Sequence, residues 1–302
     1  MAEGFDEHDG GPEAARALAD FLAHHPNTLV LTGAGLSTAS GIPDYRDRDG
    51  VRRGRPPIQG PEFRRSPAVQ RRYWARSMIG WPVLAQARPN AGHAALAALE
   101  AGGHIGALLT QNVDGLHQRA GSQAVLELHG NIHAVLCLGC GTRVTRASVQ
   151  EQLFEANPQV ANAVAQPLPD GDAQVEPEFL DDFHLPVCGH CGGTLMPDVV
   201  FFGDNVPAAR TASALAHMAA ADALLVVGSS LMVFSGFRFC RLAFDAGKPI
   251  AAVNLGRTRA DHMIALKIEA SAERLLPPVA RLLREAGSAR PPIEFIQERG
   301  IF

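Results

Sequence analysis

Four of the five cysteines stand in two pairs whose spacing is typical of a metal site. The pairs are Cys137/Cys140 and Cys188/Cys191, they lie 47 residues apart, and glycine follows each of them. Glycine there permits the tight turn in which backbone N–H groups point at thiolate sulfur, and four thiolates bind Zn²⁺ tetrahedrally with no open position for chemistry. Two redox pairs or four unrelated thiols are the alternatives. The spacing favours one structural zinc ion.

A glycine-rich turn follows the short apolar run 28–32 and predicts a nucleotide site. Its residues are Gly33, Ala34, Gly35, Leu36 and Ser37, whose backbone amides could hold phosphate oxygens at a helix N-terminus. The turn differs from the dehydrogenase fingerprint, because position 38 is threonine and no acid-ended strand follows about 20 residues later. If this turn binds NAD, it does so in another way than a dehydrogenase.

Three further polar groups come directly after apolar runs. They are Thr110–Gln111–Asn112–Val113–Asp114, Gly228–Ser229–Ser230 and Asn254–Leu255–Gly256. Turn chemistry could explain any one of them alone. The carboxyl ends of parallel strands meet at one edge of a sheet and collect ligands there, so three such groups together indicate a binding site.

The elements that must position these groups alternate between strand and helix. Short apolar runs predict strands at 28–32, 105–110, 125–128, 199–202, 224–227 and 250–254. Helical spacing predicts helices at 14–24, 91–101, 208–220, 236–246 and 272–285. The alternation indicates an α/β fold with a doubly wound, Rossmann-like parallel sheet. We expect residues 1–131 and 195–302 to form it, with a loop and small helical layer inserted at about 45–90. Residues 132–194 would form a smaller zinc-binding module that carries a long loop at 157–182.

Composition excludes several classes of protein. The 302 residues are 46% hydrophobic, enough for a sizeable core, yet no apolar run reaches the ~18 residues of a membrane span. The net charge of −4 and the lack of a long basic tail argue against nucleic acid as a partner. Acidic residues near the N-terminus argue against a transit peptide, and no apolar signal region is present. We expect a cytoplasmic protein without membrane or nucleic-acid partners. Its oligomeric state stays open, with a monomer as one option.

These motifs, taken in order, resemble those of the sirtuins. The resemblance runs from about residue 29 to 276 and rests on Gly33 to Ser37, Ser40 to Arg46, Thr110 to His117, Leu128–His129–Gly130–Asn131, the two cysteine pairs, Pro197 to Asp204, Gly228 to Ser230 and Asn254 to Gly256. Details at 44–46, 72–76, 81–82 and 169–172 are similar to class II, the branch with the mitochondrial lipoamidase-type enzyme. The lack of a transit peptide suggests a bacterial relative.

The resemblance implies a role for each group. Gly33, Ala34, Gly35 and Ser37 would hold the NAD pyrophosphate, and Pro43, Asp44, Tyr45 and Arg46 would belong to the loop over the nicotinamide ribose. Gln111 and Val113 would flank Asn112, which positions that ribose, and Asp114, which binds the carboxamide. Gly228, Ser229, Ser230, Asn254, Leu255, Gly256 and Ala272 would complete the cofactor site. His129 would be the general base, and Val199, Val200, Phe201, Phe202 and Gly203 would pair with the substrate backbone.

The implied reaction transfers an acyl group from a protein lysine to ADP-ribose. NAD is the co-substrate, acyl-lysine proteins or peptides are the partners, and the products are nicotinamide, free lysine and 2′-O-acyl-ADP-ribose. A histidine near neutral pKa can accept the ribose proton that this chemistry releases. Mono-ADP-ribosyl transfer at the same site is the alternative, and a non-catalytic NAD-binding module is a third interpretation.

Several other residues have a structural interpretation beside a functional one. His93 and His117 fit the family pattern, and we interpret them as structural, while Cys240 fits a core position. Tyr73 and Arg76 lie three apart and resemble the acid-sensing pair of class III sirtuins. Arg76 could therefore bind an acyl chain that carries a carboxylate, although packing explains the pair equally well.

Overall fold

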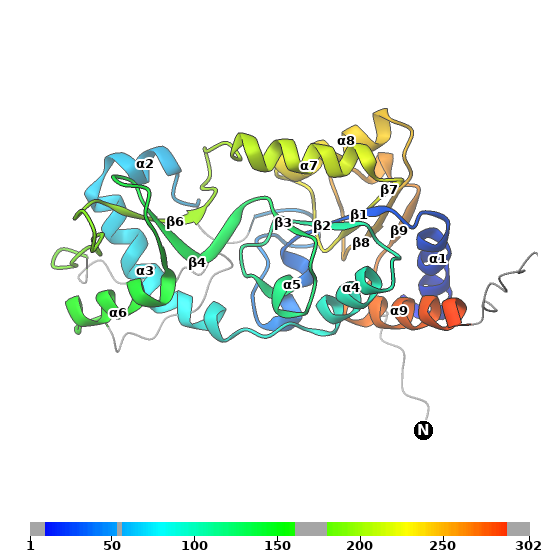
Figure 1. The fold of residues 1–302 in the computed structure, drawn as a ribbon, viewed down its shortest axis with the longest axis horizontal. Coiled ribbons are helices and arrows are strands. Elements are labelled where there is room, and N and C mark those ends of the chain that lie inside the picture. The colour runs from blue at the N-terminus through cyan, green and yellow to red at the C-terminus, as the bar shows by residue number, and fades with distance from the viewer. Residues whose placement is uncertain (1–9, 53–55, 161–179, 289–302) are drawn as a thin grey trace, which may run out of the picture.

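A six-stranded parallel sheet forms the centre of the larger part of the protein (Figure 1). The computed structural model describes residues 10–52, 56–160 and 180–288. The strands follow the order β3 (Val125–Glu127), β2 (Ala107–Thr110), β1 (Thr28–Thr32), β7 (Ala223–Val227), β8 (Ile250–Val253) and β9 (Leu266–Ile268). The chain reverses its direction of travel across the sheet between β1 and β7, which is where such folds bind ligands. The predicted doubly wound sheet is confirmed.

Helices cover both faces of this sheet (Figure 1). Helices α1 (Gly11–His24), α4 (Ala91–Ala101) and α9 (Ala272–Ser288) share one apolar core with β1, β7 and β8. Helices α7 (Ala208–Ala220) and α8 (Phe234–Asp245) pack on the opposite face. Strands β1, β7 and β8 are buried along their whole length, because both faces are covered and each residue must be apolar or hydrogen-bonded.

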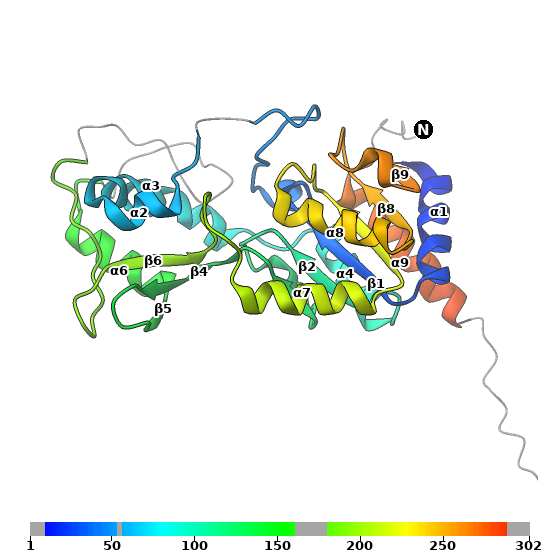
Figure 2. The same ribbon diagram turned by 90° about the horizontal axis from the view of Figure 1, so that it is seen from above.

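A second sheet lies at the other end of the molecule (Figure 2). Its antiparallel strands are β5 (Arg143–Thr145), β4 (Gly130–Cys137) and β6 (Leu195–Val199). Helices α2 (Gly60–Arg65), α3 (Pro67–Gln86) and α6 (Arg146–Ala156) surround it, and all share one apolar cluster with Cys137 and Cys188. The inserted helices therefore pack with the cysteine module. Our division of the chain at 131/132 and 194/195 stays a prediction.

The predicted strand at 199–202 is wrong in its position. The strand is β6, which ends at Val199, where it pairs with Gly130 after an irregularity in the β4–β6 register. The carbonyl of Phe201 then accepts from the Asp204 amide (3.1 Å) and that of Phe202 from the Gly60 amide (2.9 Å), so the chain turns away from the ladder. Most of the expected loop 157–182 lies outside the described residues.

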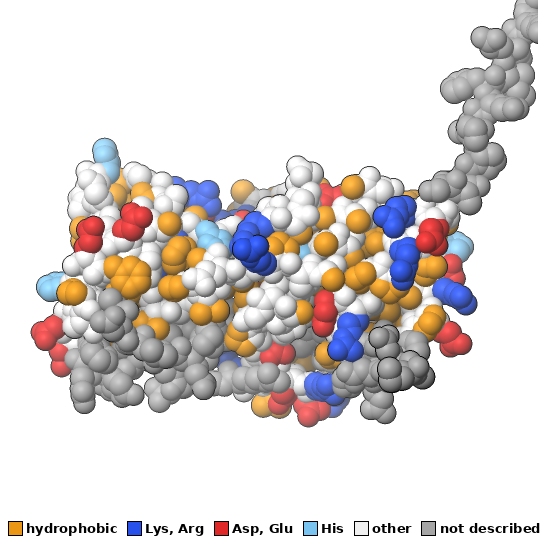
Figure 3. Space-filling view, turned by 90° about the horizontal axis from the view of Figure 1, so that it is seen from below, with side chains coloured by type: hydrophobic (Ala, Val, Ile, Leu, Met, Phe, Trp, Pro, Cys, Tyr) orange, Lys and Arg blue, Asp and Glu red, His pale blue; other side chains and the backbone are white. Residues whose placement is uncertain are grey.

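Short helical segments complete the main fold. They are α5 (Leu116–Arg119) and the 3₁₀ turns η1 (Ala34–Leu36), η2 (Thr38–Ser40) and η4 (Asp261–Met263). No described helix is long and apolar enough to cross a membrane. On the face seen in Figure 3, basic side chains lie among acidic and hydrophobic ones rather than in a stripe.

Two buried histidines make the fold sensitive to acid. The rings of His93 and His117 lie 5.1 Å apart, and His117 Nε2 is 2.9 Å from the Thr32 hydroxyl at the end of β1. Burial lowers the pKa of His93 to about 4 and that of His117 to about 3. Both are buried among structural elements, in agreement with the structural role that we expected.

We therefore expect the free energy of unfolding to fall as pH falls below about 6.5. Below that pH the unfolded chain binds protons at these histidines, whereas the folded chain does not. Each histidine therefore lowers the free energy of unfolding by about 1.4 kcal/mol per pH unit down to about pH 4. His117→Gln should reduce the slope of unfolding free energy against pH, measured by urea titration. His24→Gln, at an exposed position, should leave it unchanged. Equal slopes in all three proteins would contradict this account.

Candidate active site

The four cysteines come together as predicted. Their Sγ atoms all lie within 4.8 Å of one another, with Cys137 and Cys191 at 3.5 Å and Cys140 and Cys188 at 3.8 Å. Sulfur atoms bound tetrahedrally at ~2.3 Å from zinc would lie ~3.8 Å apart, so the cluster fits that ion. Cys240 is buried in the core of the large sheet, away from this cluster.

Each pair forms the same tight turn. The Gly141 amide donates to the Cys137 carbonyl (2.9 Å), and the Gly192 amide donates to the Cys188 carbonyl (2.8 Å). Gly141 and Gly192 have φ of 72° and 71°, a region that favours glycine. The glycine after each pair therefore closes the tight turn that the sequence suggested.

Removal of one ligand should release the metal and destabilise the fold. We expect about one zinc per chain in the wild type and none in Cys188→Ser, with a melting temperature lower by roughly 10 °C. Elemental analysis and thermal unfolding measure these effects. The matched variant Cys240→Ala removes a buried thiol from the other core, so it should keep its zinc. A wild type that binds no zinc after refolding with the metal would refute the assignment.

A single cavity of about 770 Å³ brings most of the predicted site residues together. Strand ends β1, β2, β7 and β8 contribute to its wall, together with the segment after β6. The predicted residues that line it are Gly33, Ala34, Gly35, Ser37, Asp44, Tyr45, Arg46, Gln111, Asn112, Val113, Asp114, His129, Val199, Val200, Phe201, Phe202, Gly203, Gly228, Ser229, Ser230, Asn254, Leu255 and Ala272. These residues come from distant parts of the chain and meet at one sheet edge.

The glycine turn holds the cavity wall through backbone contacts. The Gly33 amide donates to the Val227 carbonyl (3.0 Å), and the Gly35 amide donates to the Gly228 carbonyl (2.8 Å). The amides of Leu36 and Ser37 bond within the turn as well. Four of the five amides of the turn thus bond within the protein, and phosphate binding by this turn stays a prediction. Within the described structure, the Ala34 amide is the one without such a bond.

Buried polar side chains form a network beneath the turn. Asn112 Nδ2 donates to the Gly33 carbonyl (3.0 Å) and to Ser37 Oγ (3.1 Å), and Ser37 Oγ donates to Asp114 Oδ2 (2.7 Å). The other oxygen of Asp114 accepts from the Leu116 amide (3.0 Å). Burial of polar groups costs free energy unless they are hydrogen-bonded, and these bonds fix Asn112 and Asp114 in the cavity wall.

Ser229 is arranged to donate into the cavity. Its Oγ accepts from Gln111 Nε2 (2.8 Å) and from the Leu231 amide (3.3 Å). Both acceptor positions of the hydroxyl are thus used, which leaves its proton for an acceptor such as a phosphate oxygen.

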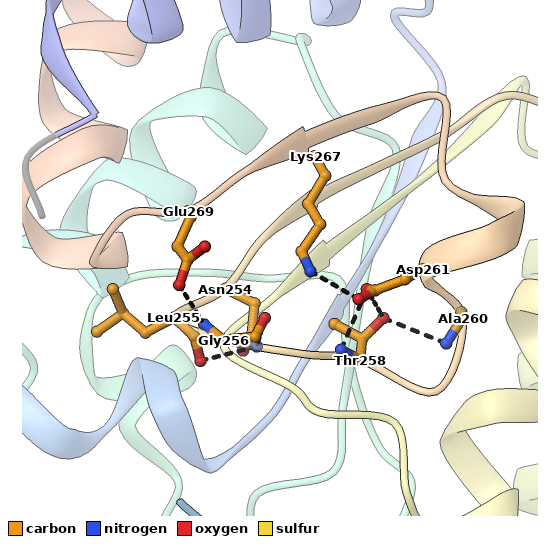
Figure 4. Close-up of polar contacts among 8 residues, drawn as sticks. All are labelled: Asn254, Leu255, Gly256, Thr258, Ala260, Asp261, Lys267 and Glu269. Carbon is orange, nitrogen blue, oxygen red and sulfur yellow. Dashed lines mark hydrogen bonds and ion pairs between the residues drawn. The ribbon is translucent and has the colours of Figure 1, made fainter. Parts of the chain in front are cut away.

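The loop after β8 is fixed by residues around β9 (Figure 4). Asn254 Nδ2 donates to the carbonyls of Leu255 (3.2 Å) and Gly256 (3.3 Å), and the Gly256 amide donates to Glu269 Oε1 (3.1 Å). Of the predicted cofactor residues, Gly256 and Pro43 do not line the cavity among the described residues. Gly256 has φ of 88° and packs against the Arg48 backbone, so its role is to let two loops approach.

His129 presents a neutral imidazole to the cavity. Its Nδ1 lies 2.9 Å from the Gln111 carbonyl, which can only accept, so Nδ1 carries the proton. Burial lowers the pKa of His129, the bond to Gln111 raises it, and the charges of Arg238 and Arg210 lower it further. The imidazole is therefore a base at neutral pH, with its lone pair on Nε2.

The sequence did not identify several residues of the cavity wall. Apolar side chains include Ile42, Ile58, Leu84 and Ile132, and polar ones include Ser235 and Arg238. Tyr73 also lines the cavity, whereas Arg76 is not among the described lining residues, so the acid-sensing hypothesis gains no support from this arrangement. No local pattern marks Ser235, because it precedes the predicted helix at 236–246 and its contact with His129 spans 106 positions of the chain.

A doubly wound sheet whose switch point holds a cavity with polar groups from four strand ends is typical of a nucleotide-binding protein, and a four-cysteine module accompanies it here. A family model described as "Sir2 family" matches residues 33–235. An "NAD-dependent protein deacetylase" of Xanthomonas campestris pv. campestris (strain 8004) is 54% identical over 260 residues, which cover 86% of this chain and 89% of that protein. The chain therefore belongs to the Sir2 family.

Solved structures agree with this assignment. The structure of a Sir2 mutant with a p53 peptide and NAD is 32% identical in sequence and has a TM-score of 0.70. The alignment covers 91% of this chain and 99% of that one. Sir2Tm bound to a propionylated peptide is 31% identical, with a TM-score of 0.69 and the same coverage. The resemblance to sirtuins is confirmed, and the class II assignment stays a prediction.

Proposed function

We propose that this protein is an NAD-dependent protein-lysine deacylase that transfers the acyl group to ADP-ribose. The observation that carries the proposal is one cavity that brings a neutral histidine together with the glycine turn and the polar side chains of Asn112, Asp114, Ser229 and Asn254 from four strand ends. The curated Xanthomonas relative has the matching name, and the two related structures hold a peptide, one of them with NAD.

Different residues of the cavity would bind and orient the different parts of NAD. Ser229 would donate to the pyrophosphate, together with the Ala34 amide, and Asn254 would bind the adenine ribose. Asn112 and Asp114, held by the buried network, would orient the nicotinamide ribose and its carboxamide. Pre-formed donors and acceptors need no rearrangement when the reaction begins, and this lowers the barrier.

The co-substrate supplies a glycosidic bond that the pyridinium charge already activates. The protein then has to hold the acyl-lysine amide oxygen close to the ribose carbon. Val199 to Gly203 line the cavity and would bind the peptide, although the carbonyls of Phe201 and Phe202 are already bonded within the protein. A peptide strand would therefore pair with other backbone groups of this segment. His129 Nε2 would accept the proton of a ribose hydroxyl after nicotinamide leaves.

The cavity wall favours an aliphatic acyl group. Tyr73, Leu84 and Ile132 line it, and Tyr73 packs against the Phe201 ring at 5.4 Å between centroids. We propose that an uncharged acyl chain lies against these side chains, because their rings and methyl groups offer it apolar surface.

Mass spectrometry of the products tests the proposal. Wild-type protein with NAD and acyl-lysine peptides should form 2′-O-acyl-ADP-ribose, and His129→Ala should lose at least roughly 100-fold of this activity, since a positioned base contributes that much. A panel of acetyl, propionyl, longer aliphatic and glutaryl peptides identifies the preferred acyl group. ADP-ribosylated protein without acyl-ADP-ribose would contradict the proposal and establish the transferase alternative.

A further inference from the structure

Ser235 contacts the one nitrogen of His129 that the proposed reaction needs. Its Oγ lies 2.7 Å from His129 Nε2, and both side chains line the cavity. Since Nδ1 carries the proton, Nε2 accepts and the Ser235 hydroxyl donates. The hydroxyl thus donates to the lone pair of Nε2, which would accept the ribose proton in the proposed reaction.

The hydroxyl has no competing role in its own helix. Ser235 is the second residue of α8, whose N-cap is Val233 and has no side-chain cap bond. The amides of Gly236 and Phe237 bond to the Val233 carbonyl instead. A serine in the first helical turn often caps the helix, whereas this one points its hydroxyl at a residue 106 positions earlier in the chain.

We propose that Ser235 is a positioning residue for the base, and this inference rests on the proposed function of His129. Its hydrogen bond and that of the Gln111 carbonyl hold the imidazole at both nitrogens. They fix the ring orientation and the tautomer with the lone pair on Nε2. When substrate binds, the ribose hydroxyl takes over the bond to Nε2, and the Ser235 side chain turns away.

Charges around the imidazole support this arrangement. Arg238 of α8 and Arg210 of α7 both act on His129, and Arg210 pairs with Asp198 of β6 at 3.0 Å. The N-terminal end of α8 adds a partial positive charge. These positive charges disfavour the imidazolium before substrate binds. A hydroxyl that donates to Nε2 stabilises the neutral ring, so it also favours the neutral form.

Kinetics of Ser235→Ala and Ser235→Thr test the inference. Ser235→Ala should lower kcat for deacylation roughly tenfold, with KM for NAD changed less than about twofold. Exchange of labelled nicotinamide into NAD should stay close to the wild-type rate, because no base is needed before nicotinamide leaves. Ser235→Thr, which keeps the hydroxyl, should recover most of the deacylation. Ser148→Ala removes a half-buried hydroxyl, bonded locally to the Thr145 carbonyl (2.9 Å), from the cysteine module and serves as the control.

NMR titration of the His129 imidazole gives a readout independent of turnover. Loss of the donated hydrogen bond should raise the pKa of His129 in Ser235→Ala. In Ser235→Thr, which keeps the hydroxyl, the pKa of His129 should return to the wild-type value. An unchanged His129 titration, or deacylation and exchange reduced to the same extent, would overturn the inference. Absence of acyl-ADP-ribose from the wild type would instead overturn the proposed function, and the NMR result would still decide whether Ser235 controls the imidazole.

Discussion

The close approach of two backbone turns determines the geometry of the whole site. Gly33 and Gly35 follow β1, and their amides donate to the carbonyls of Val227 (3.0 Å) and Gly228 (2.8 Å) at the end of β7. A Cβ at Gly35 would lie 2.9 Å from the Gly228 carbonyl, and one at Gly228 would overlap the backbone of Gly35 and Leu36. Only glycine permits this contact, and the contact brings the polar groups after four strands to one cavity.

The buried network beneath the turn depends on the same contact. Asn112 reaches the Gly33 carbonyl, and Ser37 reaches Asp114, so the ends of β1 and β2 are joined by side chains as well as by the sheet. Such a network is costly when only partly satisfied, and it therefore favours one arrangement of Asn112 and Asp114. The free-energy cost of burying these polar groups is expected for a site that must orient a ligand before any chemistry occurs.

Local sequence patterns predicted five of the six strands of the large sheet, missing β9, and predicted the small sheet poorly. Helices α4 and α7 have the predicted bounds, since their apolar faces, and for α4 the Asn90 cap, are set by nearby residues. Strand β4 and helix α6 were missed, and β6 was placed too late in the chain. β4 pairs with β6, which follows it in the chain only after the whole cysteine module. Pairing between strands so far apart in the sequence is not visible in the pattern of a few neighbouring residues.

The site was predictable wherever a motif fixes a backbone turn. The cysteine turns and the strand-end groups are of this kind, and the structure brings them together. The bonds of the turn amides could not be predicted, because they depend on how closely β1 and β7 approach. Ser235 was missed for a related reason, since its contact with His129 depends on the rotation of α8 about its own axis.

The most direct test of this account compares ADP-ribose binding by Gly228→Ala and Gly247→Ala. The two glycines have similar φ, 61° and 68°, so alanine causes similar backbone strain at both. A Cβ at Gly247 meets nothing within 4 Å, whereas one at Gly228 meets the glycine turn. Calorimetry should show binding weakened at least roughly tenfold in Gly228→Ala, about 1.4 kcal/mol, and nearly unchanged in Gly247→Ala. Equal affinities in the two variants would contradict the claim that this backbone contact builds the site.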